Sequence, residues 1–330
     1  MPFLDGEKFR EAYRRAERGS YAFMANNIAE SNVLVGLLEA YSEQRSDLIV
    51  QVSAGAAKHA GAGDKAIGLR VLSGMIRELA DRYPIGVFLN LDHFTTKESD
   101  LIREAIEHRL VSSIMIDASQ ETFEDNVRIT KDVVQRARGS GILIEAELGK
   151  IKGVEDEISS DEALYTDPDE AVEFVQETGL DLLAISIGTQ HGVSKGRTLD
   201  LRMDRARDIR AKLQEGGLNT PLVLHGSSGL LPDQVKTVIG HGIRKLNKDT
   251  HYQYVYGRAA CAFYARHTDE ILPPSGVDDD VVNLFSGSDW SPNKKAFDPR
   301  VVGEAIRREI KQIALALLDQ AGSAGHSLIE

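Results

Sequence analysis

The chain has 330 residues, a net charge of −12, and 42% hydrophobic and 27% charged residues, which is typical of a globular protein with one or two domains. The acidic balance argues against nucleic-acid binding, and no apolar run approaches the ~20 residues that span a bilayer. The charged N-terminal segment lacks the apolar core of a signal peptide. We therefore expect a cytoplasmic protein with no nucleic-acid and no membrane partner.

The single cysteine, Cys261, excludes an intrachain disulfide and argues against a thiolate metal site. It lies within "GRAACAFYARH", which has the apolar spacing of a helix. Because free cysteine is commonly buried as a small hydrophobic residue, we expect the same here.

Short runs rich in β-forming residues recur along the first 250 residues. Most are almost continuously apolar, as expected for strands that are covered on both faces. The eight predicted strands are 21–28, 47–53, 86–93, 112–119, 142–149, 182–189, 221–228 and 243–250.

Segments with helical periodicity separate these strands, and several begin at Asp, Ser or Thr and end at Gly. Eight strands alternating with helices predict a (β/α)8 TIM barrel. A doubly wound sheet is the competing architecture, but no GxGxxG turn follows the first strand. After about residue 251 the pattern is helical, interrupted by the polar stretch "PPSGVDDDVVNLFSGSDWSPNKKAF". We expect a single domain over residues 1–330, with the barrel at about 15–255 and a C-terminal helical extension at about 256–330.

Polar residues occur where each predicted strand ends, and in a TIM barrel these ends form one rim that carries the active site. The rim residues are Asn27, Ser53, Asp92 with His93, Asp117 to Ser119, Glu145 with Glu147, Thr189 to His191, His225 to Ser228, and Asn247 to Thr250.

Three histidines on this rim, with a carboxylate from a fourth strand, predict a metal site. His93, His191, His225 and Glu147 would bind one divalent ion and leave a position open, as in catalytic zinc sites. Glu145 lies two residues before Glu147, so it faces the same side and would orient a ligand or bind a second ion. Asp92 and His93 would diverge on an ideal strand, but a turn at the strand end would present both.

Three glycine-rich or polar loops on the rim are candidates for phosphate binding. "HGSSG" (225–229) precedes a helix, so its backbone amides could face an anion. "HGVSKG" (191–196) offers Gly192 for close backbone approach and Lys195 for charge, and "NKDT" (247–250) offers donors including Thr250.

With these motifs in order, the sequence resembles the class II, metal-dependent fructose-bisphosphate aldolases. The resemblance runs from "YAFMANNI" nearly to the end of the chain, including "KKAFDPR" at 294–300. It rests on "LDHF" (91–94), "MIDAS" (115–119), "EAELG" (145–149) with "GVED" (153–156), "IGTQHGVSKG" (187–196), "LHGSSG" (224–229) and "KLNKDT" (245–250).

For the metal, the resemblance implies that His93, His191 and His225 are zinc ligands and that Glu147 is an exchangeable carboxylate ligand. Asp117 and Glu145 match positions that hold an alternative or second metal ion. Cobalt, iron or manganese would also suit this set of ligands. A monovalent cation is a further candidate cofactor.

For catalysis, the resemblance implies that Asp92 exchanges a proton with the C4 oxygen. It implies that Glu155, in the loop after the fifth strand, moves protons at the dihydroxyacetone-phosphate carbon.

For substrate binding, the resemblance implies a phosphorylated ketose held at both ends. One phosphate and its neighbouring hydroxyls match Gly192, Lys195, Gly226, Ser228, Asn247, Asp249 and Thr250, and the second half of the substrate matches Asn27 and Ser53. Arg300 matches an arginine that reaches the far phosphate from a neighbouring subunit, which implies a homo-oligomer, either a dimer or a tetramer.

The chain departs from the family pattern at three positions. Ser227 stands where the loop after His225 more often has glycine, Ser194 replaces a common aromatic residue, and Lys248 replaces a usual aliphatic residue. The metal residues are unaffected, and the sugar preference stays open.

The implied reaction is reversible cleavage of fructose 1,6-bisphosphate into dihydroxyacetone phosphate and glyceraldehyde 3-phosphate. Cleavage of C3–C4 beside a ketone leaves negative charge that a metal stabilises, and it requires one group to remove a proton and another to deliver one. The alternatives are tagatose 1,6-bisphosphate or a related ketose as substrate, a Schiff-base aldolase using Lys245 or Lys248, and a barrel without catalytic activity.

Overall fold

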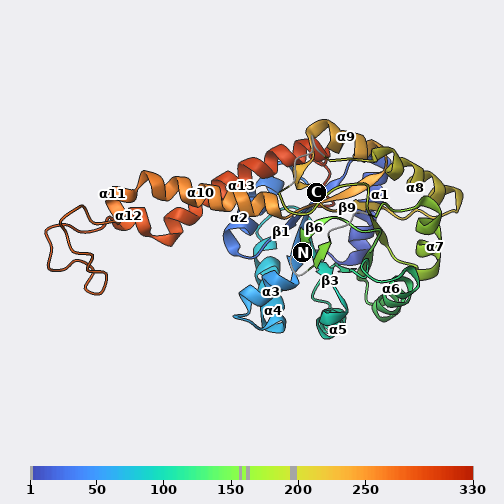
Figure 1. Cartoon of the computed structure of the whole chain (residues 1–330), viewed down its shortest axis with the longest axis horizontal. Coiled ribbons are helices and arrows are strands. Elements are labelled where there is room, and N and C mark those ends of the chain that lie inside the picture. The colour runs from blue at the N-terminus through green and yellow to red at the C-terminus, as the bar shows by residue number, and fades with distance from the viewer. Residues whose placement is uncertain (1–2, 156–157, 161–163, 194–198, 330) are drawn as a thin grey trace.

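The protein is a closed barrel of eight parallel strands surrounded by helices, with a helical arm projecting from one side (Figure 1). The computed structural model describes residues 3–155, 158–160, 164–193 and 199–329, with the backbone alone at 154, 155 and 158–160. In barrel order the strands are β1 (Phe23–Asn27), β10 (Ile243–Lys248), β9 (Leu222–Leu224), β8 (Leu182–Ile185), β5 (Leu143–Leu148), β4 (Ser113–Ile116), β3 (Val87–Phe94) and β2 (Leu48–Ser53). The predicted TIM barrel is confirmed, and the doubly wound sheet is wrong.

Helices pack around the barrel and bury the outward-facing side chains of the strands. The surrounding helices are α2 (Ser31–Glu43), α3 (Ala54–Ala60), α4 (Lys65–Ala80), α5 (Ser99–Glu107), α6 (Phe123–Ala137), α7 (Pro168–Thr178), α8 (Met203–Glu215) and α9 (Pro232–Gly240), with 3-10 turns η1 (Thr96–Glu98) and η2 (Ser227–Gly229). Side-chain caps fix where several of these helices begin. At α4, for example, the Asp64 carboxylate accepts hydrogen bonds from the N–H groups of Ala66 and Ile67. Because both faces of the strands are covered, the apolar runs are continuous rather than alternating.

Helix α1 (Gly6–Gly19) closes the end of the barrel at which the strands begin. Phe9 stacks on Phe88 with ring centroids 4.2 Å apart, and Tyr13 packs edge-on against Phe23. A cavity of about 540 Å³ lies at this end, lined by residues including Arg10, Arg210 and Leu222, and it contains none of the predicted site residues. A ligand therefore reaches the barrel axis from the opposite end, where the strands finish.

The segment after β5 contains a hairpin that the sequence did not predict. Strands β6 (Gly153–Glu155) and β7 (Ile158–Ser160) pair antiparallel. Beside the hairpin, Lys152 forms a bridge with Gln190, and the His191 N–H donates to the Lys152 carbonyl oxygen at 2.9 Å. The hairpin is therefore joined to the loop that carries His191.

The C-terminal region forms the arm, which we define as the outer part of α10 (Thr250–Arg266), α11 (Thr268–Ile271), residues 272–293, α12 (Lys294–Phe297) and the start of α13 (Pro299–Ala321). Helix α13 returns along α10 and packs on α2 (Figure 1). The expected burial of Cys261 is wrong: it is exposed on α10, because that helix extends beyond the barrel. None of the described helices is both long and apolar enough to cross a membrane.

Candidate metal centre and active site

The end of β3 brings Asp92 and His93 to the same side of the strand. His93 has φ of +50°, and the pairing of β3 with β4 shifts register between Leu91 and Phe94, which is a β-bulge. A bulge interrupts the alternation of side chains, so two consecutive residues both face the barrel axis. Asp92 is 1% exposed and His93 is 5% exposed, so both are enclosed by the rim.

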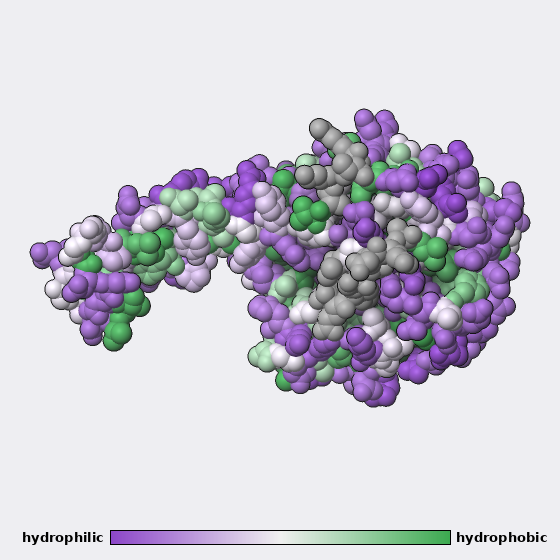
Figure 2. Space-filling view, in the orientation of Figure 1, coloured by the Kyte–Doolittle hydropathy of each residue, from purple (hydrophilic) through white to green (hydrophobic). Residues whose placement is uncertain are grey.

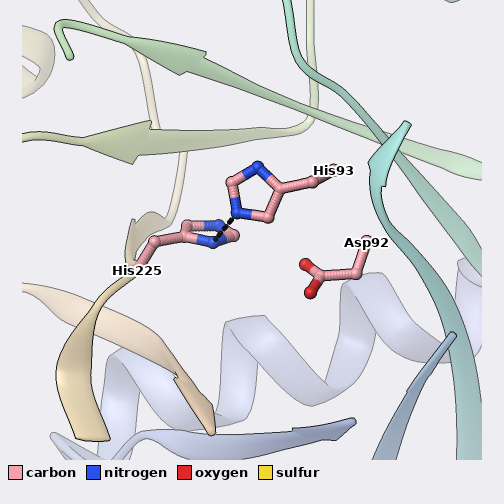
Figure 3. Close-up of side chains that lie close together, drawn as sticks. All are labelled: Asp92, His93 and His225. Atoms are coloured by element: carbon pink, nitrogen blue, oxygen red, sulfur yellow. Dashed lines mark hydrogen bonds between the residues drawn. The ribbon is translucent and has the colours of Figure 1, made fainter. Parts of the chain in front are cut away.

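Two imidazoles face each other at the centre of the rim. His93 Nε2 lies 2.9 Å from His225 Nδ1, and Figure 3 shows both rings converging with the Asp92 carboxylate. On the far side of each ring is a carboxylate: Asp117 Oδ2 lies 2.7 Å from His93 Nδ1, and Glu145 Oε1 lies 2.9 Å from His225 Nε2. Glu145 also accepts a hydrogen bond from Lys245 Nζ at 2.6 Å.

This arrangement determines which ring nitrogens can act as ligands. A carboxylate accepts an N–H, so Asp117 places the proton of His93 on Nδ1 and Glu145 places the proton of His225 on Nε2. The two remaining nitrogens then point their lone pairs at one another. Asn247 Nδ2 also lies 3.0 Å from His225 Nδ1. A metal ion bound by both nitrogens would remove the repulsion between their lone pairs, so these imidazoles are arranged to fit a metal ion.

The carboxylates near the imidazoles differ in their ionisation. Burial opposes ionisation of Asp117, but the hydrogen bond from His93 holds the Asp117 pKa well below its usual range. Burial and the nearby negative charge of Asp117 raise the pKa of Glu147 well above its usual range. Burial lowers the pKa of His225, which favours the neutral ring that a metal requires.

Two overlapping groups have ligand atoms within 4.8 Å of one another: Asp92, His93 and His225 form one, and His93, Asp117 and Glu147 form the other. Glu147 Oε2 is buried without a hydrogen-bond partner, which is costly for a carboxylate unless a ligand satisfies it. His191 lies beside both groups, since its ring centroid is 5.3 Å from that of His93 and 6.4 Å from that of His225. The residues present therefore fit a divalent metal ion.

Asp92 is held by three side-chain amides from three strands. Gln51 Nε2 donates to Asp92 Oδ1 at 2.7 Å, Asn247 Nδ2 donates to the same oxygen at 3.0 Å, and Asn27 Nδ2 donates to Oδ2 at 2.8 Å. The carbonyl oxygens of these three amides are buried without hydrogen-bond partners. The amides thus orient the carboxylate and leave acceptors available to hydroxyl groups of a ligand.

Gln51 and Lys245 are site residues whose contacts the motifs do not indicate. Gln51 is fully buried in β2 and contacts Asp92, and Lys245 is fully buried in β10 and contacts Glu145. The sequence does contain a signal for both. Each lies two residues before a predicted rim residue, Ser53 or Asn247, and therefore faces the same side of its strand.

The predicted phosphate residues lie on the same rim. Gly226 has φ of +61°, and a Cβ there would lie 2.8 Å from the Gln190 carbonyl oxygen, so only glycine fits. Ser228 lies in η2, and Gly192 has φ of +78°, with no described atom within 4 Å of an added Cβ. Asp249 and Thr250 fall at the start of α10 rather than within β10.

Four further predicted residues remain, and two of them fall wholly or partly outside the described part of the chain. Ser53 pairs with Asp92 across β2 and β3, and its hydroxyl also caps α3. Lys195 lies outside the described residues, as does the side chain of Glu155, whose backbone ends β6. Arg300 lies on α13 where that helix begins in the arm, paired with Asp298 through two hydrogen bonds of 3.0 and 2.7 Å.

Comparison with known proteins shows which family the chain resembles. The model of the family described as "Fructose-bisphosphate aldolase class-II" matches residues 7–326. The fructose-bisphosphate aldolase of Thermus caldophilus is 33% identical, covering 96% of this chain and 98% of that protein. That of Helicobacter pylori strain 26695 is 39% identical, covering 69% of this chain and 71% of that protein.

Solved structures share the fold. Fructose-bisphosphate aldolase from Campylobacter jejuni superposes with a TM-score of 0.82 at 23% identity, covering 98% of this chain and 97% of that chain. The YdjI aldolase from Escherichia coli K12 superposes with a TM-score of 0.71 at 28% identity, covering 97% of this chain and 98% of that chain. The family match along nearly the whole sequence, together with the barrel and its carboxylate–histidine site, shows that this chain belongs to the class II fructose-bisphosphate aldolases, a family of metal-dependent lyases.

Proposed function

We propose that this protein catalyses the zinc-dependent, reversible cleavage of fructose 1,6-bisphosphate to dihydroxyacetone phosphate and glyceraldehyde 3-phosphate, a reaction of glycolysis and gluconeogenesis. The observation that carries the proposal is the pair of imidazole nitrogens facing each other beside Asp92, with each ring oriented by a carboxylate. The names of the relatives favour the same substrate.

His93, His191 and His225 would hold the ion, with Glu147 as carboxylate ligand and with Asp117 and Glu145 orienting the imidazoles or binding an alternative ion. When bound, the ion supplies Lewis-acid stabilisation of the negative charge that C3–C4 cleavage leaves on the substrate. The orphaned oxygen of Glu147 and the facing lone pairs of His93 and His225 support this assignment.

Asp92 is the proposed base in the cleavage direction. It accepts the proton of the C4 hydroxyl as the C3–C4 bond breaks, and the C4 oxygen becomes the aldehyde oxygen of glyceraldehyde 3-phosphate. Glu155 delivers a proton to C3 of the other fragment, which becomes dihydroxyacetone phosphate. In the condensation direction both proton transfers reverse.

The two ends of the substrate are assigned to different parts of the rim. One phosphate would lie at Gly192, Lys195, Gly226, Ser228, Asp249 and Thr250, and the hydroxyls would meet the free carbonyl oxygens of Asn27, Gln51 and Asn247. Ser53 would face the second half of the substrate. Arg300 would reach the far phosphate from a second copy of the chain, because it begins a helix in the projecting arm (Figure 1).

The Schiff-base alternative receives no support from the contacts of the two lysines. Lys245 Nζ donates to Glu145 Oε2 at 2.6 Å, so its nitrogen is already occupied within the site. Lys248 donates to the Ser227 carbonyl oxygen and is on the opposite face of β10 from Asn247. Tagatose 1,6-bisphosphate, which differs at C4, stays the alternative substrate.

A coupled assay with fructose 1,6-bisphosphate and tagatose 1,6-bisphosphate, before and after EDTA and after zinc is added back, tests the proposal. We expect turnover of the fructose substrate that EDTA abolishes and zinc restores. His93→Ala should lose bound zinc and activity, whereas His108→Ala, which removes an exposed histidine, should retain both. EDTA-resistant turnover trapped by borohydride would contradict the mechanism, and faster cleavage of the tagatose substrate would change the substrate alone.

A further inference from the structure

Lys248 is a buried cation that the proposed mechanism does not use. Its side chain is 1% exposed in β10, and its Nζ donates to the Ser227 carbonyl oxygen at 2.7 Å. Within the described part of the chain it has no carboxylate partner; the neighbouring Asp249 accepts hydrogen bonds from Gln253 instead. Burying an ammonium without an opposite charge is strongly unfavourable, so its presence calls for a compensating anion.

Lys248 in β10 and Ser227 in η2 contact each other. Ser227 Oγ donates to the Asn247 carbonyl oxygen at 2.7 Å, and Lys248 donates back to the Ser227 carbonyl oxygen. Together these bonds fasten turn η2 to the end of β10. A glycine and an aliphatic residue at these two positions could form neither side-chain bond.

The hydrogen bond from Lys248 also helps to fix the direction of a peptide group, because the Ser227 carbonyl oxygen accepts from Lys248 and from the Leu230 N–H at 3.3 Å. In a trans peptide the C=O and the N–H point to opposite sides, so holding the Ser227 carbonyl oxygen directs the Ser228 N–H away from Lys248. Ser228 and Gly226 are in the turn to which the proposed function assigns a substrate phosphate. The ammonium thus lies behind the turn and on the opposite side of the peptide from that N–H.

We propose that Lys248 is a positioning residue for a phosphorylated ligand: its ammonium orients the Ser227–Ser228 peptide and supplies a buried positive charge that a phosphate dianion neutralises. The inference rests on the proposed function, since that function places the phosphate at this turn. In a chain with a net charge of −12, such a local cation offsets the repulsion of an anionic substrate.

The titration of Lys248 supports this role. Burial lowers its pKa from the usual value to about 8, so the ammonium predominates below pH 8 and is lost above it. The groups around it include the neutral Asn26 on β1 and Ser227 on η2, Asp249 at the end of β10, and His251 on α10. Burial and the Lys248 charge lower the pKa of His251, so this imidazole is neutral where the ammonium is lost.

The test is Lys248→Met, which keeps an unbranched side chain, one atom shorter, and removes the charge, with Lys236→Met on the exposed face of α9 as the matched control. Titration calorimetry with inorganic phosphate measures affinity without turnover, and steady-state kinetics with fructose 1,6-bisphosphate separates KM from kcat. We expect Lys248→Met to weaken phosphate binding and to raise KM by about tenfold, the effect of losing one hydrogen-bonded charge, with kcat changed about twofold at most. Lys236→Met should match the wild type.

Two further readouts separate positioning from a merely structural role. Between pH 7 and pH 9, phosphate affinity should fall in the wild type and in Lys236→Met but not in Lys248→Met. The melting temperature of Lys248→Met should equal or exceed that of the wild type, because an unpaired buried charge is removed.

Equal phosphate affinity in the wild type and Lys248→Met, with the wild type active, would overturn this inference and leave the proposed function intact. A wild type that neither binds phosphate nor cleaves fructose 1,6-bisphosphate would overturn both.

Discussion

Asp92 is held in place by Asn27, Gln51 and Asn247, and Gln51 is the one of the three that the sequence motifs omit. A carboxylate that receives protons must be aligned with the substrate hydroxyl, and each amide restricts its rotation. Because Gln51 is fully buried and bonds Asp92 through the shortest of the three contacts, it has the strongest claim to this positioning role.

We expect Gln51→Leu to lower kcat by roughly 10- to 100-fold, since a hydrogen bond to a charged group contributes about 1.5–3 kcal/mol. Zinc content should not change, because Gln51 does not contact the imidazoles. Gln135→Leu, an exposed glutamine on α6, is the control for the substitution itself. Loss of zinc together with activity would show that Gln51 supports the whole site rather than Asp92.

At the scale of elements, the site depends on two irregular segments. The bulge at His93 turns two consecutive side chains to one side, and hairpin β6–β7 adjoins the loop that carries His191. Gly153 begins this hairpin with φ of +116°, and a Cβ there would lie 2.8 Å from the His191 carbonyl oxygen and 3.0 Å from its nitrogen. The backbone around His191 can keep its position only while residue 153 is glycine.

Gly153→Ala should therefore displace His191 and lower both zinc affinity and kcat by about tenfold or more. Gly139→Ala is the control, because Gly139 also has a positive φ of +80° but nothing lies within 4 Å of its added Cβ. Both substitutions strain the backbone by about 1–3 kcal/mol and should lower the melting temperature. Only Gly153→Ala should change the zinc titration; equal zinc affinity in both variants would contradict the link between hairpin and metal site.

At the scale of the whole molecule, the arm exposes apolar surface that no other part of the same chain covers among the described residues. Apolar side chains that are 57–94% exposed occur along it, namely Leu272, Val281, Val282 and Leu284, and Figure 2 shows apolar surface on the arm. Such surface is favourable to cover, and Arg300 begins a helix in the same region. Both observations support the proposal of a homo-oligomer in which the arm contacts a second copy.

We expect the wild type to sediment as a dimer or larger, and the double variant Val282→Asp with Leu284→Asp to shift toward monomer with lower activity. Two charges placed in an apolar contact would lose their hydration without gaining partners. Val71→Asp is the control, since Val71 is also 52% exposed but lies on α4 of the barrel. A monomeric double variant with full activity would rule out a role for Arg300 across the interface.

The fold and much of the rim could be predicted because they follow from local pattern. Eight apolar runs alternating with helical periodicity predict a barrel, and its strand ends must share one rim, which brings His93, Asp117, Glu145, Glu147 and His225 together. Family membership, confirmed along nearly the whole chain, followed from motifs at those ends.

The tertiary structure alone decided how individual side chains are oriented and which distant segments of the chain contact each other. The bulge at His93, the donation of Gln51 to Asp92, and the pairing of Lys248 with Ser227 depend on which backbone atoms of separate strands meet. The exposure of Cys261 depends on where α10 leaves the barrel, because its apolar spacing is the same on a covered or an uncovered helix. Periodicity specifies which face of an element is apolar, but the neighbours that a side chain meets are set by packing across the whole barrel.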